Sequence, residues 1–363
     1  MQSKILVGAK EFMNALKSRA LAATQSLYVQ AMTFEGDSAG ESLINLMIHS
    51  PAKDKRLIID SFSKVVVSDH FVFGARYLKD SKFRAEVHNT YHLIDKARSH
   101  GIQVKFINPT GPMMLRYPLR NHKKMMIVDQ QYAFIGGINF SEHNFEWYDM
   151  MVELKDPSTS DELSKDFLQT WKGVNQSKNI SVNSNQLFFF NGIKSERMYE
   201  EFFDLIRKAK KNILVISPYI SDPLLPILME KAKSGIKVDI ISPEQNNKGF
   251  FYNYLIAQSS EGQFNLYHHP GMFHLKAILI DSRKLIFGSS NYDLISYHFE
   301  QEVVVVCQET SLIQEFITRI VRPMKEISKP YFPNGVSSIK SKMILKIVSK
   351  LSHILSRSFL KPA

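Results

Sequence analysis

Two histidines, His122 and His274, each begin the same arrangement of residues, and these residue types suit chemistry at phosphorus. In each arrangement a lysine follows the histidine by two positions, an aspartate by seven, a glycine by 14 and an asparagine by 17. We call residues 122–139 the first cassette and residues 274–291 the second cassette. The shared members are His122, Lys124, Asp129, Gly136 and Asn139 in the first, and His274, Lys276, Asp281, Gly288 and Asn291 in the second. Because five positions repeat at one offset of 152, the pattern indicates an internal duplication.

The cassettes predict nucleophilic catalysis on a phosphodiester. Residues two apart on a strand project from one face, so each lysine is expected beside its histidine. If both cassettes act on one phosphate, a neutral histidine can attack phosphorus while a protonated one gives a proton to the leaving alkoxide. The lysines, Asn139 and Asn291 would stabilise charge on the phosphoryl oxygens, and the glycine turns would let the backbone approach them. This scheme needs no metal and no organic cofactor.

A structural interpretation of the histidines competes with the catalytic one. Both histidines could sit at the starts of strands with their hydrogen bonds satisfied inside the fold. That interpretation explains neither the lysines nor the repetition of five positions. The catalytic interpretation is therefore favoured.

The elements around the cassettes alternate between helical and strand patterns in both halves of the chain, which predicts an α/β sandwich in each half. Length also favours two domains, because 363 residues exceed one ordinary core. The expected domains are residues 1–172 and 187–333, joined by a polar linker at 173–186 and followed by a separate segment at 334–363. Helices are expected at 11–24, 41–49, 88–99, 161–171, 197–210 and 223–232, and strands at 27–34, 56–62, 102–107, 125–128, 212–217, 237–241 and 264–268.

Composition narrows the compartment and the partners. The single cysteine, Cys307, follows an apolar run and is expected to be a buried thiol in a reducing, cytoplasmic setting. No Cys/His spacing predicts a zinc site, and neither a signal peptide nor a spanning apolar run is evident. The net charge of +11 predicts an anionic partner, either nucleic acid or an acidic membrane surface.

The C-terminal segment, residues 334–363, holds six of these positive charges and no acidic residue. Its apolar side chains recur at helical spacing opposite a basic face that includes Lys346 and Lys350, so a peripheral membrane helix is predicted. The alternative is a terminal helix packed on the core with its basic face solvated. Charge gathered outside both cassettes favours a membrane surface over the long basic groove expected of a nuclease.

The first half has a longer loop before its cassette than the second half. From Gly101 to His122 the distance is 21 residues, against 12 from Gly262 to His274. The extra residues could contact acyl chains and lipid phosphates, or could equally be packed filler between the domains. The candidate lipid contacts in this loop are Met113, Met114, Arg116 and Arg120.

The repeated His-x-Lys-x4-Asp-x6-Gly-x2-Asn pattern resembles the phospholipase D superfamily over nearly the whole chain. The resemblance implies two similar α/β/α sandwich domains related by a pseudo-two-fold axis, and a ping-pong reaction through a phosphohistidine. His122 would be the nucleophile and His274 the general acid, and Asp149 and Glu302 would orient the imidazoles. The residues implied to support the motif structurally are Asp129, Asp281, Gly136, Gly137, Gly288 and Ser289.

Flanking residues are similar to those of bacterial cardiolipin synthases of the phospholipase D type. The similarity lies in residues 119–124, 134–139, 147–149 and 288–293. It implies transfer of a phosphatidyl group onto an alcohol such as phosphatidylglycerol, at the inner face of the membrane, by a monomer that carries both cassettes. Hydrolysis of phospholipids and cleavage of nucleic acid stay open as alternatives. Two departures, Ile295 where many such enzymes have arginine and Glu300 where asparagine is usual, bear on the acceptor alcohol.

Overall fold

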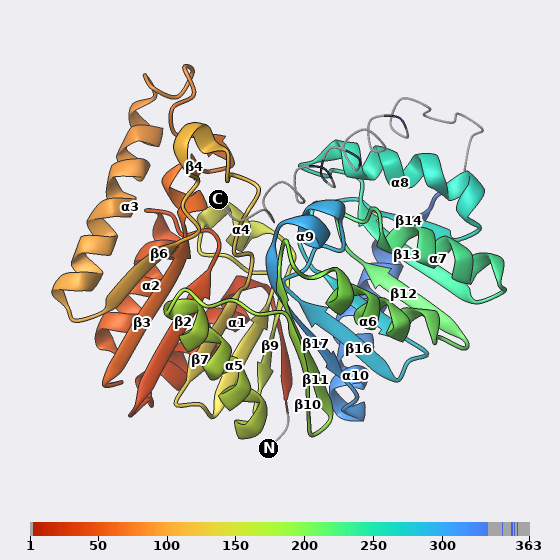
Figure 1. Ribbon diagram of the computed structural model, residues 1–363, viewed down its shortest axis with the longest axis horizontal. Coiled ribbons are helices and arrows are strands. Elements are labelled where there is room, and N and C mark those ends of the chain that lie inside the picture. Colours follow the sequence, from red (N-terminus) through yellow and green to blue (C-terminus); the bar gives the residue numbers. More distant parts are fainter. Residues whose placement is uncertain (1–2, 333–342, 344–349, 351, 353, 355–363) are drawn as a thin grey trace. The chain divides into compact units, whose positions relative to one another are not determined.

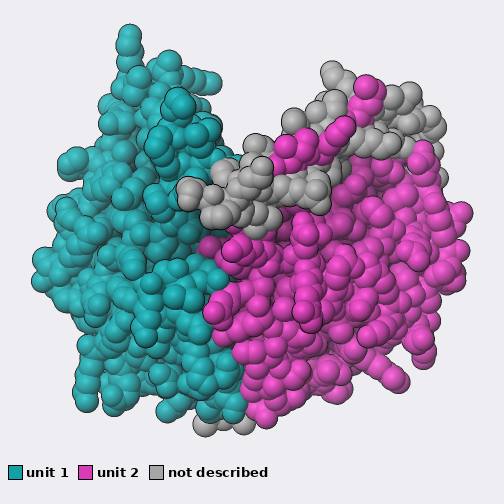
Figure 2. All heavy atoms as spheres, viewed as in Figure 1, with its two compact units in different colours: residues 1–175 teal, residues 176–363 magenta. Residues whose placement is uncertain are grey.

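The computed structural model describes residues 3–332 and four positions beyond them: 343, 350, 352 and 354. The chain divides into two compact units, residues 1–175 and residues 176–363, shown in separate colours in Figure 2. The predicted segment at 334–363, including Lys346, lies almost wholly outside the described residues. Each unit is built around its own mixed sheet (Figure 1).

The first unit has a seven-stranded sheet in the order β1-β9-β8-β7-β2-β3-β6. β2, β3 and β6 are parallel, and the other pairs are antiparallel. The strands are β1 (Lys4–Val7), β2 (Ser26–Ala31), β3 (Asp54–Asp60), β6 (Gln103–Ile107), β7 (Met125–Val128), β8 (Tyr132–Gly136) and β9 (Met150–Leu154). A separate short pair is formed by β4 (Val66–Val67) and β5 (His70–Phe71).

Helices cover both faces of this sheet. Side chains of α1 (Gly8–Leu21), α2 (Ser38–His49) and α3 (Ser81–Ser99) enter one apolar core with the strands, because their buried positions recur at helical spacing. On the other face lies α5 (Pro157–Trp171), where Phe167 stacks on Tyr28 of β2 with ring centroids 4.8 Å apart. A short helix, α4 (Glu142–Glu146), follows the first cassette.

The second unit repeats this strand order and extends it. Its sheet runs β10-β11-β17-β16-β15-β12-β13-β14-β18, so β17-β16-β15-β12-β13-β14 corresponds to β9-β8-β7-β2-β3-β6. The strands are β10 (Lys178–Val182), β11 (Asn185–Asn191), β12 (Asn212–Ile216), β13 (Lys237–Pro243), β14 (Asn265–His269), β15 (Ala277–Ile280), β16 (Lys284–Gly288), β17 (Gln301–Cys307) and β18 (Lys329–Pro330). The α/β fold expected for each half is confirmed.

Helices again lie on two faces of the sheet. α6 (Glu196–Arg207), α7 (Leu224–Lys233) and α8 (Gly249–Gly262) share one core with alternate residues of the strands. A continuous helical stretch, α10 (Thr310–Phe316), a π turn (Ile317–Val321) and α11 (Arg322–Ile327), occupies the opposite face. α9 (Leu294–His298) follows the second cassette, and its residues lie 152 positions after those of α4.

Seven of the 14 residues predicted as a linker, 173–186, are strand residues of the second unit's sheet. Residues 178–182 form β10, which pairs antiparallel with β11. The polar composition that suggested a linker belongs to a half-buried edge strand and its turn. The expectation for Cys307 is confirmed, because it is a buried, free thiol.

Candidate active site

Both cassettes place a histidine and a lysine just before the first strand of a β-hairpin, β7–β8 in the first unit and β15–β16 in the second. His122 precedes β7 and His274 precedes β15, and both imidazoles are almost fully buried within the described chain. The Lys124 ammonium donates a hydrogen bond to the backbone carbonyl of His122 at 2.7 Å, and Lys276 donates equally to the carbonyl of His274. Each lysine is therefore held beside its own histidine by a local bond that fixes the position of its charge.

The cassette aspartates tie the turn of each hairpin to the beginning of the neighbouring strand. Asp129 accepts hydrogen bonds of 2.8 Å from the backbone N–H groups of Thr24, Gln25 and Ser26. Burial opposes ionisation, but these N–H groups outweigh it and lower the pKa of Asp129. The resemblance gives this aspartate a supporting role, and its contacts are those of a support.

Asp281 repeats this arrangement in the second unit. Its carboxylate accepts from the backbone N–H groups of Lys210, Lys211 and Asn212 at 2.7–3.2 Å. Burial again opposes ionisation, and the N–H groups of the strand start again lower the pKa of Asp281. The same bond pattern in both units is independent structural evidence of the duplication.

The glycines that end each hairpin make room for neighbouring protein groups. A Cβ atom on Gly136 would lie 2.2 Å from the Met150 carbonyl oxygen, and one on Gly288 would lie 2.2 Å from that of Val303. A side chain at either position would push the adjacent strand away. The glycine turns are expected to let the backbone approach a phosphate, whereas their described close contacts are with β9 and β17.

The position after each of these glycines differs between the units. A Cβ on Gly137 would lie 2.4 Å from Asp149 Oδ2, so only glycine leaves space for that buried carboxylate. Ser289 occupies the corresponding position in the second unit and donates a hydrogen bond to Glu302. The Ser296 hydroxyl lies 2.9 Å from the other oxygen of Glu302, so hydroxyl groups flank both oxygens of that carboxylate.

The two cassette asparagines have different environments. Asn139 accepts a hydrogen bond from the backbone N–H of Thr33 at 3.2 Å through its side-chain oxygen. Asn291 Oδ1 is buried and accepts no hydrogen bond from any residue that the structure describes. The second asparagine therefore offers an acceptor that the fold itself does not use.

Two buried ion pairs lie beside the first cassette, and no periodic pattern in the sequence indicates either of them. Arg120 contacts Asp60 at the end of β3 at 2.6 Å, and Lys123 contacts Asp166 of α5 at 2.7 Å. Burial raises the pKa of Asp60 to about 7, although Arg120 acts to lower it. Arg120 is a predicted lipid contact, but it is buried inside the unit, where its guanidinium pairs with the fully buried carboxylate of Asp60.

The remaining candidate lipid contacts lie at the surface of the first unit. Met113 is 88% exposed and Arg116 is also exposed, whereas Met114 is partly buried. Lys350 is exposed in the described part of the C-terminal segment. None of the helices in the described part of the chain is long and apolar enough to cross a membrane.

A group of carboxylates in the first unit could hold a cation. Oxygen atoms of Glu35, Asp37 and Glu86 lie within 4.8 Å of one another, and His143 lies 3.5 Å from Glu35. Asp37 already caps α2 by accepting the backbone N–H groups of residues 39 and 40. Burial and the charge of Glu35 raise the pKa of Glu86 to about 7, so protonation lowers the repulsion within this group.

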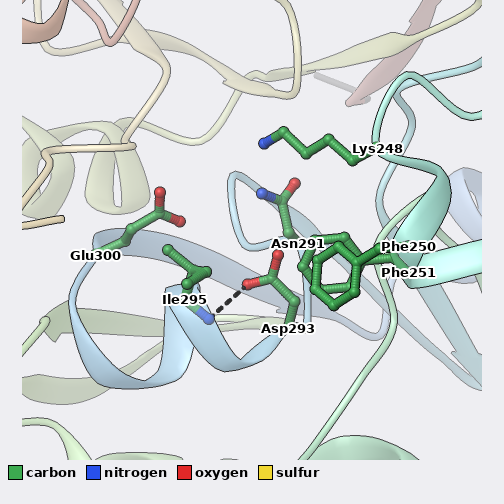
Figure 3. Close-up of a pocket in the computed structure, with 7 residues that line it drawn as sticks. All are labelled: Lys248, Phe250, Phe251, Asn291, Asp293, Ile295 and Glu300. Atoms are coloured by element: carbon green, nitrogen blue, oxygen red, sulfur yellow. Dashed lines mark hydrogen bonds between the residues drawn. The ribbon is translucent and has the colours of Figure 1, made fainter. Parts of the chain in front are cut away.

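A cavity of about 350 Å³ adjoins the second cassette within the second unit (Figure 3). The residue shared by cavity and cassette is Asn291. Tyr219 links the two regions, because its ring packs edge-on against His274 and lies 4.9 Å from the Lys248 ammonium. The lining residues are Lys248, Phe250, Phe251, Asn291, Asp293, Ile295 and Glu300.

Comparison with known proteins follows the same division of the chain. A family model described as "Cardiolipin synthase, PLD-like domain" matches residues 16–171 and 202–322. A cardiolipin synthase of Clostridium perfringens strain SM101 is 25% identical over 295 residues, covering 71% of this chain. One of Geobacillus sp. strain WCH70 is 21% identical, covering 98% of this chain and 72% of its own length. The chain spans 62% of the length of the Clostridium relative.

The fold has a solved counterpart. Phosphatidylserine synthase of Haemophilus influenzae Rd KW20 superposes with a TM-score of 0.72 at 15% identity, covering 96% of this chain and 94% of its own. At that identity the likeness establishes the fold alone. The family model, in contrast, covers more than half of the chain and includes both cassettes. The chain therefore belongs to the cardiolipin synthase family of phospholipase D-like proteins.

Proposed function

We propose that this protein is a phosphatidyltransferase that moves a phosphatidyl group from a phospholipid onto an alcohol through a covalent phosphohistidine. The observation that carries the proposal is the duplicated set of buried histidine, lysine and asparagine side chains on equivalent strands of two units. Family membership and the name of the relatives, cardiolipin synthase, support a phospholipid substrate and an alcohol acceptor.

In the first half-reaction, an imidazole nitrogen of His122 attacks phosphorus. A P–N bond forms, the P–O bond to the leaving alcohol breaks, and His274 supplies the proton to the departing oxygen. In the second half-reaction, the acceptor hydroxyl oxygen attacks phosphorus, its proton passes to His274, and the P–N bond breaks. Lys124 and Lys276, fixed on their histidine carbonyls, stabilise the negative charge of the phosphoryl oxygens.

The carboxylates Asp149 and Glu302 are proposed to hold a catalytic imidazole in one tautomer. Both are buried at the ends of hairpins adjoining the cassettes. Asn139 and Asn291 are proposed as amide donors to the phosphate. Since imidazole, ammonium and amide groups supply every step, we expect turnover to persist in excess chelator.

The first experiment is incubation of the whole protein with phosphatidylglycerol vesicles, with products identified by mass spectrometry. Cardiolipin and glycerol are expected in equal amounts, with and without EDTA. His122→Ala should abolish both products, whereas His92→Ala, which changes an exposed histidine outside both cassettes, should leave them unchanged. Cleavage of DNA without turnover of lipid would contradict the proposal.

We also propose that the protein attaches to an anionic membrane surface through residues 334–363. The six basic residues of this segment and the exposure of Lys350 support the proposal. Deletion of residues 336–363 should reduce cosedimentation with phosphatidylglycerol vesicles and leave turnover of a soluble phosphodiester intact. Vesicles of phosphatidylcholine serve as the uncharged control, and unchanged cosedimentation with anionic vesicles would contradict attachment by this segment.

A further inference from the structure

The cavity beside the second cassette presents mostly hydrogen-bond acceptors to a ligand. Asn291 is 4% exposed, and its Oδ1 has no donor among the described residues. Asp293 and Glu300 are buried carboxylates in the same lining. A buried acceptor without a donor is costly, so this lining favours a ligand that brings hydrogen-bond donors.

The charges of the cavity favour a cationic ligand. Of the seven lining residues, Asp293 and Glu300 are acidic and Lys248 alone is basic, with its ammonium 4.9 Å from the Tyr219 ring, so the carboxylates outnumber the cation. Burial and the negative charge of Glu300 raise the pKa of Asp293 to about 7, against hydrogen bonding from Ser296 and the charge of Lys248. Asp293 accepts hydrogen bonds from the backbone N–H groups of Ile295 and Ser296, and Glu300 accepts one from the Ser296 hydroxyl, so both carboxylates are held in place at the cavity wall (Figure 3).

Aromatic rings complete the cavity wall. Figure 3 shows the rings of Phe250 and Phe251 beside Asn291 and Asp293, and their centroids lie 4.2 Å apart. The face of an aromatic ring attracts an ammonium group, especially where water is excluded. Carboxylates and aromatic rings together are the side chains that suit an organic cation.

Ile295 and Glu300 also line this cavity. Glu300 adds a buried carboxylate to the lining, whereas Ile295 adds no charge. A cationic acceptor is therefore favoured over a neutral one of the same length.

We propose that this cavity binds the ammonium group of a small amino alcohol, and that this alcohol is the acceptor in the second half-reaction. The inference rests on the proposed function. The acceptor hydroxyl oxygen attacks phosphorus, its proton passes to His274 and the P–N bond to His122 breaks, so the product is a phospholipid with an amino-alcohol head group. The ammonium group is bound by Glu300, Asp293 and Asn291 Oδ1 and takes no part in the bond changes.

The test offers the whole protein two acceptors of equal length that differ in charge. Phosphatidylglycerol vesicles are the donor, and ethanolamine and ethylene glycol are supplied together at equal concentration and pH 7. Mass spectrometry measures phosphatidylethanolamine against phosphatidyl-ethylene glycol. We expect ethanolamine to be favoured by about tenfold, the order of one charge-assisted hydrogen bond.

Three variants should move this ratio in stated directions. Glu300→Gln removes one negative charge while keeping the side-chain size, and Ile295→Arg adds a positive charge, so both should lower the preference for ethanolamine by about tenfold. Lys248→Gln removes the positive charge and should raise it. Ile236→Arg is the matched control, because Ile236 is a partly buried residue on the same core that does not line the cavity.

The outcomes separate this inference from the proposed function. If the wild-type protein transfers phosphatidyl groups to neither acceptor and forms no cardiolipin, the proposed function fails. If transfer occurs without preference for ethanolamine, or if the preference is unchanged in both Glu300→Gln and Ile295→Arg, the cavity assignment is overturned and the transferase activity stands. The wild-type ratio alone decides the case if a variant does not fold.

Discussion

The two units build the same hairpin but surround it differently. In both, a lysine bonds to its histidine carbonyl and an aspartate bonds to three backbone N–H groups of the neighbouring strand. Around the first cassette are two buried ion pairs, Arg120–Asp60 and Lys123–Asp166. Around the second are hydroxyl groups on Glu302 and a cavity with acidic side chains.

The comparison distinguishes the groups that hold each cassette in place, which are shared, from the groups that set its chemical surroundings, which differ. The groups that position histidine and lysine are the same in both units, which is expected if both must present the same atoms to phosphate. The neighbouring charges are not repeated: Leu275 stands where the first cassette has Lys123, and Ser289 stands where it has Gly137. A duplicated scaffold with unlike surroundings suits two histidines with unlike roles.

The largest expected effect comes from removing the proposed proton donor, His274, and the proposed nucleophile, His122, separately. Loss of general acid–base catalysis costs about 10²–10⁴ in rate, so His274→Ala should nearly abolish turnover of phosphatidylglycerol. On a soluble diester with a nitrophenolate leaving group, which needs no proton, His274→Ala should recover a measurable burst of nitrophenol. His122→Ala should not recover it. The burst is measured by absorbance. If both variants recovered it equally, the proposal that His122 and His274 have different roles would be contradicted.

The second effect concerns the ion pair that only the first cassette has. Asp166→Asn leaves the Lys123 ammonium buried without its carboxylate, which is expected to cost about 3–5 kcal/mol of unfolding free energy. Asp161→Asn is the control, because Asp161 pairs with Lys165 on the exposed side of the same helix, where solvent screens the pair and the loss of stability should be much smaller. Urea unfolding measures both. Equal losses of unfolding free energy in the two variants would show that the buried pair stabilises the first unit no more than the exposed pair does.

The third effect compares one buried aspartate of each unit across pH. The pKa values of Asp60 and Asp293 are both raised to about 7 by burial, above the usual value near 4. A raised carboxyl pKa favours folding below pH 4, and this contribution is lost as pH rises toward 7. The groups that bear on Asp293 are Glu300, Glu302, Lys248 and the Ser296 N–H.

The free energy of unfolding of the wild-type protein should therefore fall between pH 5 and pH 8 because of Asp293. In Asp293→Asn this fall should be smaller by about 2–3 kcal/mol. Asp60→Asn should destabilise at both pH values, because Arg120 loses its only carboxylate among the described ion pairs. Urea unfolding at the two pH values gives the comparison. If both variants showed the same pH dependence, the difference expected between Asp60, which forms an ion pair with Arg120, and Asp293, for which the described ion pairs include no partner, would be contradicted.

The smallest effect tests the exchanged glycine and serine. Gly137→Ala places a Cβ against the Asp149 carboxylate, and Ser289→Ala removes a hydroxyl from Glu302. Each should cost about 1–2 kcal/mol, the first by overpacking and the second by loss of a hydrogen bond to a buried charge. Replacing Ser289 by glycine should add no clash beyond that loss. A stable Gly137→Ala variant would show that Asp149 can move.

The sequence predicted the parts of this molecule that repeat. The cassette, its strands and the two α/β units follow from residue identity at fixed spacing and from apolar periodicity, both of which are local. The linker prediction misses the edge strand β10, which pairs with β11 on one side and leaves its other side half-exposed, so that polar residues are tolerated there. The partners of Arg120 and Lys123 lie 60 and 43 residues away, so no local pattern identifies them. The cavity likewise joins α8 to residues after β16.

The aspartate at the turn of each cassette hairpin has a consequence for how the protein folds. Asp129 bonds to residues 103–105 positions earlier, and Asp281 bonds to residues 69–71 positions earlier. The hairpin carrying the histidine is therefore completed only when a distant strand has docked, and such long loop closures slow folding. We expect each cassette to form late and together with its whole sheet. A nascent or partly unfolded chain then exposes no assembled cassette hairpin.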